Sequence, residues 1–133
     1  MSQENVEIVR RGIDAFNRRD QEAMLEQISP AIEFRSYLIG ALEAEVLQGH
    51  AGARRWWDRI MEAFPDLRYE VLDERARGDK VMVKFMNRAS GATSGAPVDL
   101  ILWTVFTVRG GKVTHWFTFR TENEALEAAG LSE

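Results

Sequence analysis

The stretch from Val98 to Gly130 constrains the fold of this chain more than any other part of it. A long apolar segment, an Arg-Gly-Gly-Lys turn at 109–112, a second apolar segment and a short helical segment follow one another without a break. Two apolar segments joined by a glycine-rich turn predict an antiparallel hairpin. Thr121 and Glu124 then predict a capping box, in which the threonine hydroxyl accepts a bond from the Glu124 amide and the carboxylate bonds back to the Thr121 amide.

The first half of the chain has the apolar spacing of helices. This spacing predicts a helix that begins at Ser2, its N-cap, and ends near Asn17. Asp20 is the predicted cap of a second, shorter helix, which Pro30 should end because proline has no amide hydrogen. A third helix is predicted for 49–64, since Phe64 precedes a proline.

Most other segments alternate apolar and polar residues, as half-buried strands do. The alternation predicts a short strand at 32–35 and longer strands at 67–71 and 80–89, with an Arg-Gly-Asp turn at 77–79. Residues 37–47 have no period and are predicted to form a loop over the mouth of any cavity. Together with the C-terminal hairpin, these strands predict a curled antiparallel sheet in an α+β fold.

The last two predicted strands are apolar on both faces, whereas burial on one face alone would give a clean alternation. We expect the helices to cover one face only, so the other face needs a second cover. In a chain this short, a second copy of the chain is the simplest one. The sequence therefore predicts a homodimer that packs sheet against sheet.

Composition excludes several classes of protein. The 133 residues fit one domain, 1–133, without cysteine, so disulfides and thiolate chemistry are absent. The net charge of −4 comes from 21 acidic against 17 basic residues, and the basic pairs are expected on solvated helix faces, which argues against nucleic acid as a partner. No cationic leader or apolar run of about 18 residues occurs, so we expect a cytoplasmic protein that does not bind a membrane.

Seven short motifs occur in an order and spacing that resemble one known family. They are two N-terminal helices, Gly49-His50-Ala51-Gly52, Ala63-Phe64-Pro65-Asp66, Gly78-Asp79-Lys80-Val81, Gly111-Lys112-Val113 and the terminal 124–131 segment. The chain resembles, over nearly its whole length, the SnoaL-like branch of the nuclear transport factor 2-like (NTF2-like) superfamily. This resemblance implies a cone: a bent sheet wrapped around the N-terminal and middle helices, with an apolar interior pocket and usually a dimeric state. Its members include polyketide cyclases, ketosteroid isomerases, epoxide hydrolases, dehydratases and proteins without known activity, so the fold does not give the function.

The resemblance also implies where catalytic groups should lie. Active members use carboxylates inside the cone, because a buried carboxyl has a raised pKa and passes protons near neutral pH. The aspartate of the cyclases and epoxide hydrolases corresponds to Thr118 in this sequence. The arginine and aspartate that epoxide hydrolases carry on the third strand correspond to Phe85 and Asn87. The usual charged relay is thus replaced, and the sequence identifies no catalytic residue.

Other titratable residues have structural explanations. His115 is expected on the strand face opposite Thr118, together with Val113 and Phe117, and His50 at the start of the third helix. Asp99 is expected at a solvated strand end, and Arg35 either forms a surface ion pair or binds an anion at the pocket mouth. Two isolated histidines without ligand spacing predict no metal, and no glycine-rich loop or Ser-His-Asp set predicts a cofactor or nucleophile.

Three functions remain open from the sequence. The first is a homodimeric protein whose apolar pocket binds a small apolar or polyketide-like molecule, with Asn87 and Thr118 orienting one polar group. The second is a cyclase-, isomerase- or epoxide-hydrolase-like enzyme with a rewired site. The third is a dimer that binds other proteins. The residues expected to contact the ligand are Arg35, Tyr37, His50, Trp57, Phe64, Phe85, Asn87, Trp116 and Thr118.

Overall fold

The computed structural model describes residues 2–35, 46–90 and 97–131. These residues form four helices and six strands. The elements in chain order are α1 (Ser2–Asn17), α2 (Gln21–Glu26), β1 (Ile28–Arg35), β2 (Leu47–Gln48), α3 (Gly49–Ala63), β3 (Arg68–Arg77), β4 (Lys80–Ser90), β5 (Pro97–Arg109), β6 (Lys112–Phe119) and α4 (Glu122–Ala129). The predicted α+β class is confirmed, and the predicted loop at 37–47 lies mostly outside the described residues, with β2 at its end.

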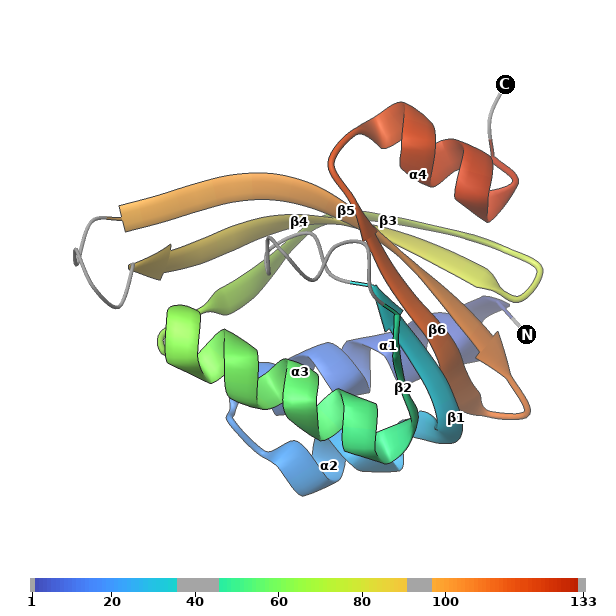
Figure 1. The fold of residues 1–133 in the computed structure, drawn as a ribbon. Coiled ribbons are helices and arrows are strands. Elements are labelled where there is room, and N and C mark those ends of the chain that lie inside the picture. Colours follow the sequence, from blue (N-terminus) through green and yellow to red (C-terminus); the bar gives the residue numbers. More distant parts are fainter. Residues whose placement is uncertain (1, 36–45, 91–96, 132–133) are drawn as a thin grey trace.

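The six strands form one curled sheet in the order β2-β1-β6-β5-β4-β3 (Figure 1). Four of the neighbouring pairs are antiparallel, as predicted, but β1 and β6 run parallel, so the sheet is mixed. The sequence analysis missed this pair because it depends on residues about 80 positions apart in the chain. The sheet does not close, since β2 and β3 are its two edges.

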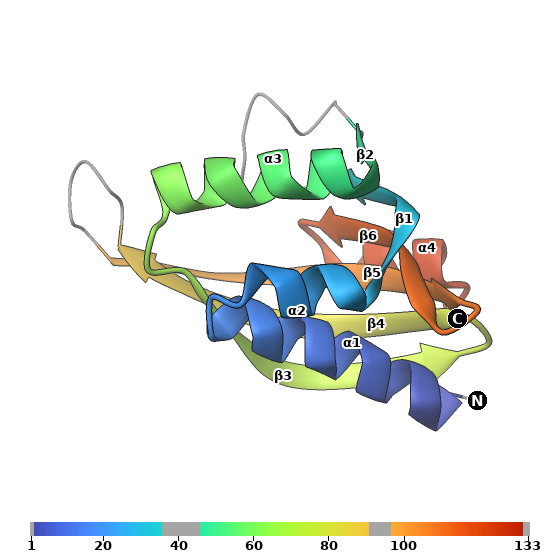
Figure 2. The ribbon, with the colours of Figure 1, turned by 90° about the horizontal axis from the view of Figure 1, so that it is seen from below.

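Helices lie on both faces of the sheet. Figures 1 and 2 show α1, α2 and α3 on one side, here called the inner face, and α4 on the other side, the outer face. α4 packs against β4, β5 and β6 through Ala125 and Ala129, which lie among Met82 and Val105. The expectation that helices cover only one face was therefore wrong, because the chain turns back after β6 and places its last helix on the outer face.

The local signals that end the helices are mostly confirmed. Asp20 caps α2, because its carboxylate accepts a hydrogen bond of 3.1 Å from the amide of Ala23. The end of α2 differs from the prediction: the helix stops at Glu26, and Pro30 lies inside strand β1. The exposed Pro30 and Ala31 fall at an irregularity in the β1–β6 pairing, between Ile28 and Glu33, where a proline removes no ladder bond.

A bulge in β6 decides which of its side chains face inward. Val113 pairs with Val108 and His115 pairs with Thr107, so two steps along β6 match one step along β5. Val113 is consequently buried in the main core, whereas His115 lies with Phe117 on the outer face. The sequence analysis placed Val113 and His115 on the same face, which was wrong because strict alternation does not allow for the extra residue.

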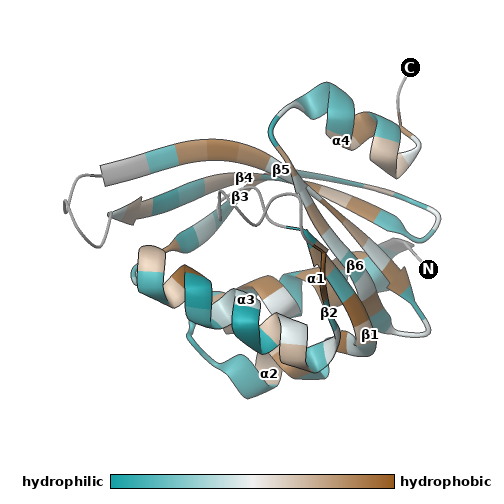
Figure 3. Ribbon diagram, viewed as in Figure 1, coloured by the Kyte–Doolittle hydropathy of each residue, from teal (hydrophilic) through white to brown (hydrophobic). Residues whose placement is uncertain are grey.

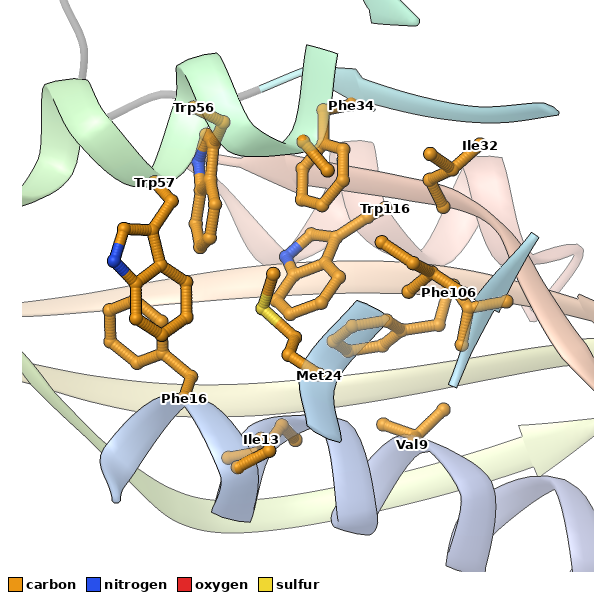
Figure 4. Close-up of a cluster of buried hydrophobic side chains, with 14 of the residues drawn as sticks. Val9, Ile13, Phe16, Met24, Ile32, Phe34, Trp56, Trp57, Phe106 and Trp116 are labelled. Carbon is orange, nitrogen blue, oxygen red and sulfur yellow. The ribbon is translucent and has the colours of Figure 1, made fainter. Parts of the chain in front are cut away.

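The core lies between the inner face and the helices α1 and α3, where Figure 3 shows apolar residues gathered. Aromatic rings fill its centre, and Figure 4 shows how side chains from α1, β1, α3, β5 and β6 meet there. Trp116 lies against Phe34 and Phe106, with ring centroids 4.9 Å apart in both pairs, and against Trp56 at 5.4 Å. The cluster holds the sheet in its curled shape around α1 and α3.

Candidate functional site

The inner face of the sheet carries a small number of polar side chains in an apolar surrounding. Among the described residues, the buried polar side chains are Asn87, Thr104 and Thr107. Asn87 and Thr104 occupy inward positions of β4 and β5, and Thr118 of β6 lies beside Thr104. We take these three residues and the apolar inner-face residues around them as the candidate site.

Thr104 and Thr118 form a hydroxyl pair across β5 and β6. They are direct partners in the register, and their Oγ1 atoms are 3.1 Å apart. Each hydroxyl carries one hydrogen, and the bond between them uses only one of the two. The pair therefore has one O–H that can donate to a third group, and Thr118 is only half buried.

The sequence analysis did not single out Thr104. A signal for it existed: Thr104 is the one polar residue among the even-numbered positions from 98 to 108, which otherwise read Val, Leu, Leu, Phe and Val. A lone polar residue on a buried strand face needs a hydrogen-bond partner. The partner itself was not predictable, since it depends on the register between β5 and β6.

Asn87 lies at the other end of the same face. It is 2% exposed, and its Nδ2 atom donates a hydrogen bond of 3.1 Å to the carbonyl oxygen of Leu100. One of the two N–H groups of this amide is thus used by the backbone of the neighbouring strand. Asn87 is held in a fixed orientation by that bond.

The register separates Asn87 from Thr118. Asn87 pairs with Leu100 and Thr118 pairs with Thr104, so the two residues flank β5 four positions apart, which is about 13 Å along the strand. Two such side chains cannot meet at one atom. The sequence analysis placed both on one polar group, and the register corrects this: a single ligand would meet them at separate points.

The same geometry corrects the expected position of the charged relay. A relay needs its members in contact, and the inward neighbours of Thr118 on the adjacent strand are Thr104 and, two residues away, Leu102 and Phe106. Phe85 and Asn87 lie one strand further, on β4. Neither the neighbours of Thr118 on β5 nor the residues on β4 include a carboxylate, and none is buried on this part of the inner face among the described residues.

Four of the aromatic residues predicted to contact a ligand lie inside the cone. Phe85 and Trp116 are buried on the inner face, Trp57 is buried on α3, and Phe64 is half buried just after it. Phe85 packs against Tyr69 with ring centroids 4.9 Å apart. Tyr69 was not predicted, and burial raises the pKa of its hydroxyl well above its usual value, so the phenol stays neutral.

Three predicted residues lie elsewhere. The Nε2 atom of His50 is 3.1 Å from the carbonyl oxygen of Ile28, which gives this histidine a structural role at the start of α3. Arg35 is exposed, and its guanidinium lies 5.0 Å from the ring centre of Phe117 on the outer face. Tyr37 lies outside the described residues.

The remaining electrostatics of the described chain are those of a surface. Basic side chains of α1 and α3 form ion pairs with neighbouring acids, for example Arg10 with Glu74 and Arg54 with Glu22. Arg19 differs from the expected solvated position, because its guanidinium donates to the carbonyl oxygens of Phe16 and Leu67. Within residues 2–35, 46–90 and 97–131, no three histidine or acidic side chains lie close enough to hold a metal ion.

Comparison with known proteins identifies the family from the sequence and the fold from solved structures. The sequence profile of the SnoaL-like domain matches residues 9–116. The match covers most of the chain, so the protein belongs to the SnoaL-like domain family. No curated protein matches the sequence.

Many solved structures are similar to this one. An NTF2-like protein of unknown function from Burkholderia pseudomallei superposes with a TM-score of 0.79 at 16% identity, covering 95% of this chain and 97% of that one. TerC, co-crystallised with polyporic acid, has a TM-score of 0.79 at 22% identity, covering 93% and 98%. A putative SnoaL-like polyketide cyclase from Jannaschia sp. CCS1 has a TM-score of 0.76 at 24% identity, covering 99% and 94%. At these identities the likeness shows the fold.

No helix in the described part of the chain is long and apolar enough to cross a membrane.

Proposed function

We propose that this SnoaL-like protein binds a small, mainly apolar organic molecule on the inner face of its sheet, and that it does so without an acid-base carboxylate. The observation that carries the proposal is the polar content of that face. On β4, β5 and β6 its described polar groups are an amide and two paired hydroxyls, set among Phe85, Leu102 and Trp116, and the neutral phenol of Tyr69 lies on β3. Apolar sites with a few fixed polar groups are typical of pockets for small organic ligands.

Two hydrogen-bond donors are available to such a ligand. One is the hydroxyl hydrogen that the Thr104–Thr118 pair does not use, and the other is the second N–H of Asn87. Because the two lie about 13 Å apart along β5, we propose that they bind opposite ends of an elongated molecule. A polyketide-like compound has this shape and polarity.

The relatives support a small-molecule ligand. TerC has been crystallised with polyporic acid, and the neighbours include a putative polyketide cyclase from Sinorhizobium meliloti at 26% identity, with a TM-score of 0.70 over 85% of this chain and 94% of that one. In this chain the described inner face of β4, β5 and β6 carries threonine and asparagine and no buried carboxylate. Acid-base catalysis typically contributes about 10² to 10⁴ in rate, so we propose weak turnover or none.

We also propose that the protein is a homodimer. On the outer face, α4 covers Met82 and Val105 but leaves the far end of β4 and β5, where Met86 is half buried and Ile101 is 36% exposed. Trp103 lies between this end and α4. We name Met86, Ile101 and Trp103 the distal patch, and we propose that it packs against the same patch of a second copy.

Binding to the inner face is tested with polyporic acid as the first probe, by calorimetry on the wild-type protein and on Thr118→Val. This substitution keeps the shape of the side chain and removes the hydroxyl. Loss of one hydrogen bond to the ligand should weaken binding about fivefold to tenfold. The matched control is Thr114→Val in the same strand, which should bind as the wild type does.

Two results would contradict the proposal. Equal affinity of the wild type and Thr118→Val would show that the hydroxyl pair does not contact the ligand. If neither this probe nor apolar ketones and lactones bind, the inner face is not a site for such molecules. Product formation from a bound ketone or lactone that Asn87→Leu abolishes in a folded protein would favour the second function, an enzyme with a rewired site.

A further inference from the structure

A cleft lies on the outer face, away from the proposed inner site. It has a volume of about 340 Å³ and is bounded by β4, β5, β6 and the C-terminal half of α4. Figure 1 shows α4 crossing the outer side of the sheet, where this cleft is formed. The volume is at the lower end of the range of small-molecule sites.

One wall of the cleft is cationic. Lys80 and Arg109 contribute it, and the half-buried His115 also lines the cleft. The Nζ atom of Lys80 donates a hydrogen bond of 3.1 Å to Oγ1 of Thr107, a side chain that is itself buried. This bond fixes the ammonium at the edge of the cleft, and it uses one of three N–H groups.

Asp79 neutralises this wall only in part. Its Oδ2 atom accepts a hydrogen bond of 2.8 Å from Nε of Arg109, whereas its Oδ1 atom is 3.9 Å from Nζ of Lys80, which is too long for a hydrogen bond. One carboxylate therefore faces two cations. Glu33 lies opposite His115 in the register of β1 and β6, and α4 carries Glu124 and Glu127 close in sequence to Ala128. Arg35 adds a further positive charge over Phe117.

The rest of the lining is mainly apolar and aromatic. Phe117 and Phe119 contribute to it from β6, and Ala128 contributes to it from α4. Both phenylalanines are half buried, so part of each ring is accessible. A ligand that contacts both parts of the lining needs a flat apolar ring for the phenylalanines and one anionic group for the cations.

We propose that this outer cleft is a separate binding site for a small aromatic carboxylate. The carboxylate contacts the ammonium of Lys80 and the guanidinium of Arg109, and the ring lies against Phe117 and Phe119. The site is independent of the inner face, because Thr118 and Trp116 point to the other side of β6. Its aromatic end adjoins the distal patch, because Phe119 is the register partner of Trp103, whereas its cationic end is further away, since Lys80 lies six residues from Met86 along β4.

The test uses 2-naphthoate as the probe and 2-naphthamide as its neutral counterpart, at low ionic strength, with methyl resonances as reporters. Val105 and Ala128 line the outer cleft, whereas Ile60 and Leu102 lie in the interior. We expect naphthoate to shift the first two resonances in a saturable way. We expect naphthamide to bind about tenfold more weakly or not at all, since charge-assisted bonds are lost.

Substitutions then locate the interaction. Lys80→Met should weaken naphthoate binding about tenfold, and the matched control Lys84→Met, on the same face of β4, should leave it unchanged. Ala128→Trp should abolish binding by filling the cleft while Lys80 and Arg109 remain. Thermal unfolding checks that every variant is folded.

Four results would overturn the proposal. Equal binding of naphthoate and naphthamide, or equal effects of Lys80→Met and Lys84→Met, would show that charge does not select the ligand. Shifts at Ile60 and Leu102 alone would place the ligand in the interior, which supports the inner site and contradicts this one. Dissociation of a wild-type dimer by Ala128→Trp would show that the cleft is an interface between copies.

Discussion

Asn17 joins two elements that are far apart in the sequence. Its Nδ2 atom donates to the carbonyl oxygen of Tyr69 and its Oδ1 atom accepts from the amide of Tyr69, both at 2.9 Å. The side chain thus supplies the two hydrogen bonds of one ladder position to the edge strand β3. It anchors that strand to the last turn of α1.

Replacing Asn17 with alanine should lower the free energy of unfolding by about 2 kcal/mol, because two part-buried backbone groups lose their partners. Urea denaturation measures the change. Asn5→Ala in the same helix is the control, since its amide makes one exposed contact of 3.4 Å with Gly78. Equal effects of the two substitutions would contradict the role assigned to Asn17.

Asp79 makes stability depend on pH. Its pKa lies below the ordinary value of 3.8, first because of the hydrogen bond from Arg109 and also because of the charge of Lys80. A lowered folded-state pKa adds stability that is complete above the unfolded pKa and is lost as the pH falls through the folded value. We therefore expect stability to decrease as the pH falls below about 4.

Asp79→Asn tests this dependence. The variant should be slightly less stable than the wild type at pH 6, and the difference should shrink as the pH falls toward the lowered pKa of Asp79. The change is small because the carboxylate is 38% exposed and screened by solvent. A constant difference between pH 3 and pH 6, measured by urea denaturation, would rule out the titration of Asp79 as the cause.

Among the elements, α4 begins and ends at local sequence signals. Thr121 accepts a hydrogen bond of 3.3 Å from the amide of Glu124, as the capping box predicts. The reciprocal contact differs, because the Glu124 carboxylate lies 3.1 Å from the Thr121 hydroxyl and accepts its hydrogen. Gly130 ends the helix in the left-handed conformation with φ of 72°.

Thr121→Ala should lower the free energy of unfolding by about 1 kcal/mol, since the helix loses its N-cap. In the same variant, the rate of hydrogen exchange at the Glu124 amide should rise, because that amide loses its hydrogen-bond acceptor. Thr121→Ser keeps the hydroxyl and should remain close to the wild type. If serine and alanine destabilise equally, the threonine methyl group and not the cap is the stabilising contact.

The strand β6 shows what alternation alone misses at the level of an element. Its bulge moves one residue out of step, so that Val113 faces the core and His115 faces the outer cleft. The bulge places a histidine and two phenylalanines beside Lys80 and Arg109. The proposed outer site thus depends on one irregular residue.

At the scale of the whole molecule, the proposed homodimer can be tested at the distal patch. We expect the wild-type protein to sediment as a dimer at micromolar concentration and Ile101→Glu to sediment as a monomer, because two buried carboxylates would face each other across a two-fold axis. Leu72→Glu is the control: Leu72 is 41% exposed but lies on the edge strand β3, outside the patch. A monomeric wild type, or dissociation by Leu72→Glu alone, would contradict the proposed interface.

The sequence by itself determined the local features of this protein. The cap at Asp20, the end of α3 before Pro65 and the turn at 109–112 were all predicted, because each depends on residues close together in the chain. In that turn Gly110 and Gly111 have φ of 59° and 79°, a conformation that other residues adopt at a cost. The family was also predictable, since its turn motifs occur in a fixed order.

Only the tertiary structure decided how distant residues meet. It pairs β1 with β6, brings Thr104 beside Thr118, separates Asn87 from them and places α4 on the outer face. The first three depend on which strands pair and in which register, and a shift of one residue would turn every side chain of a strand to the opposite face, whereas the position of α4 depends on the turn of the chain after β6. The residue pattern supports either register locally, and the packing of the whole core selects one.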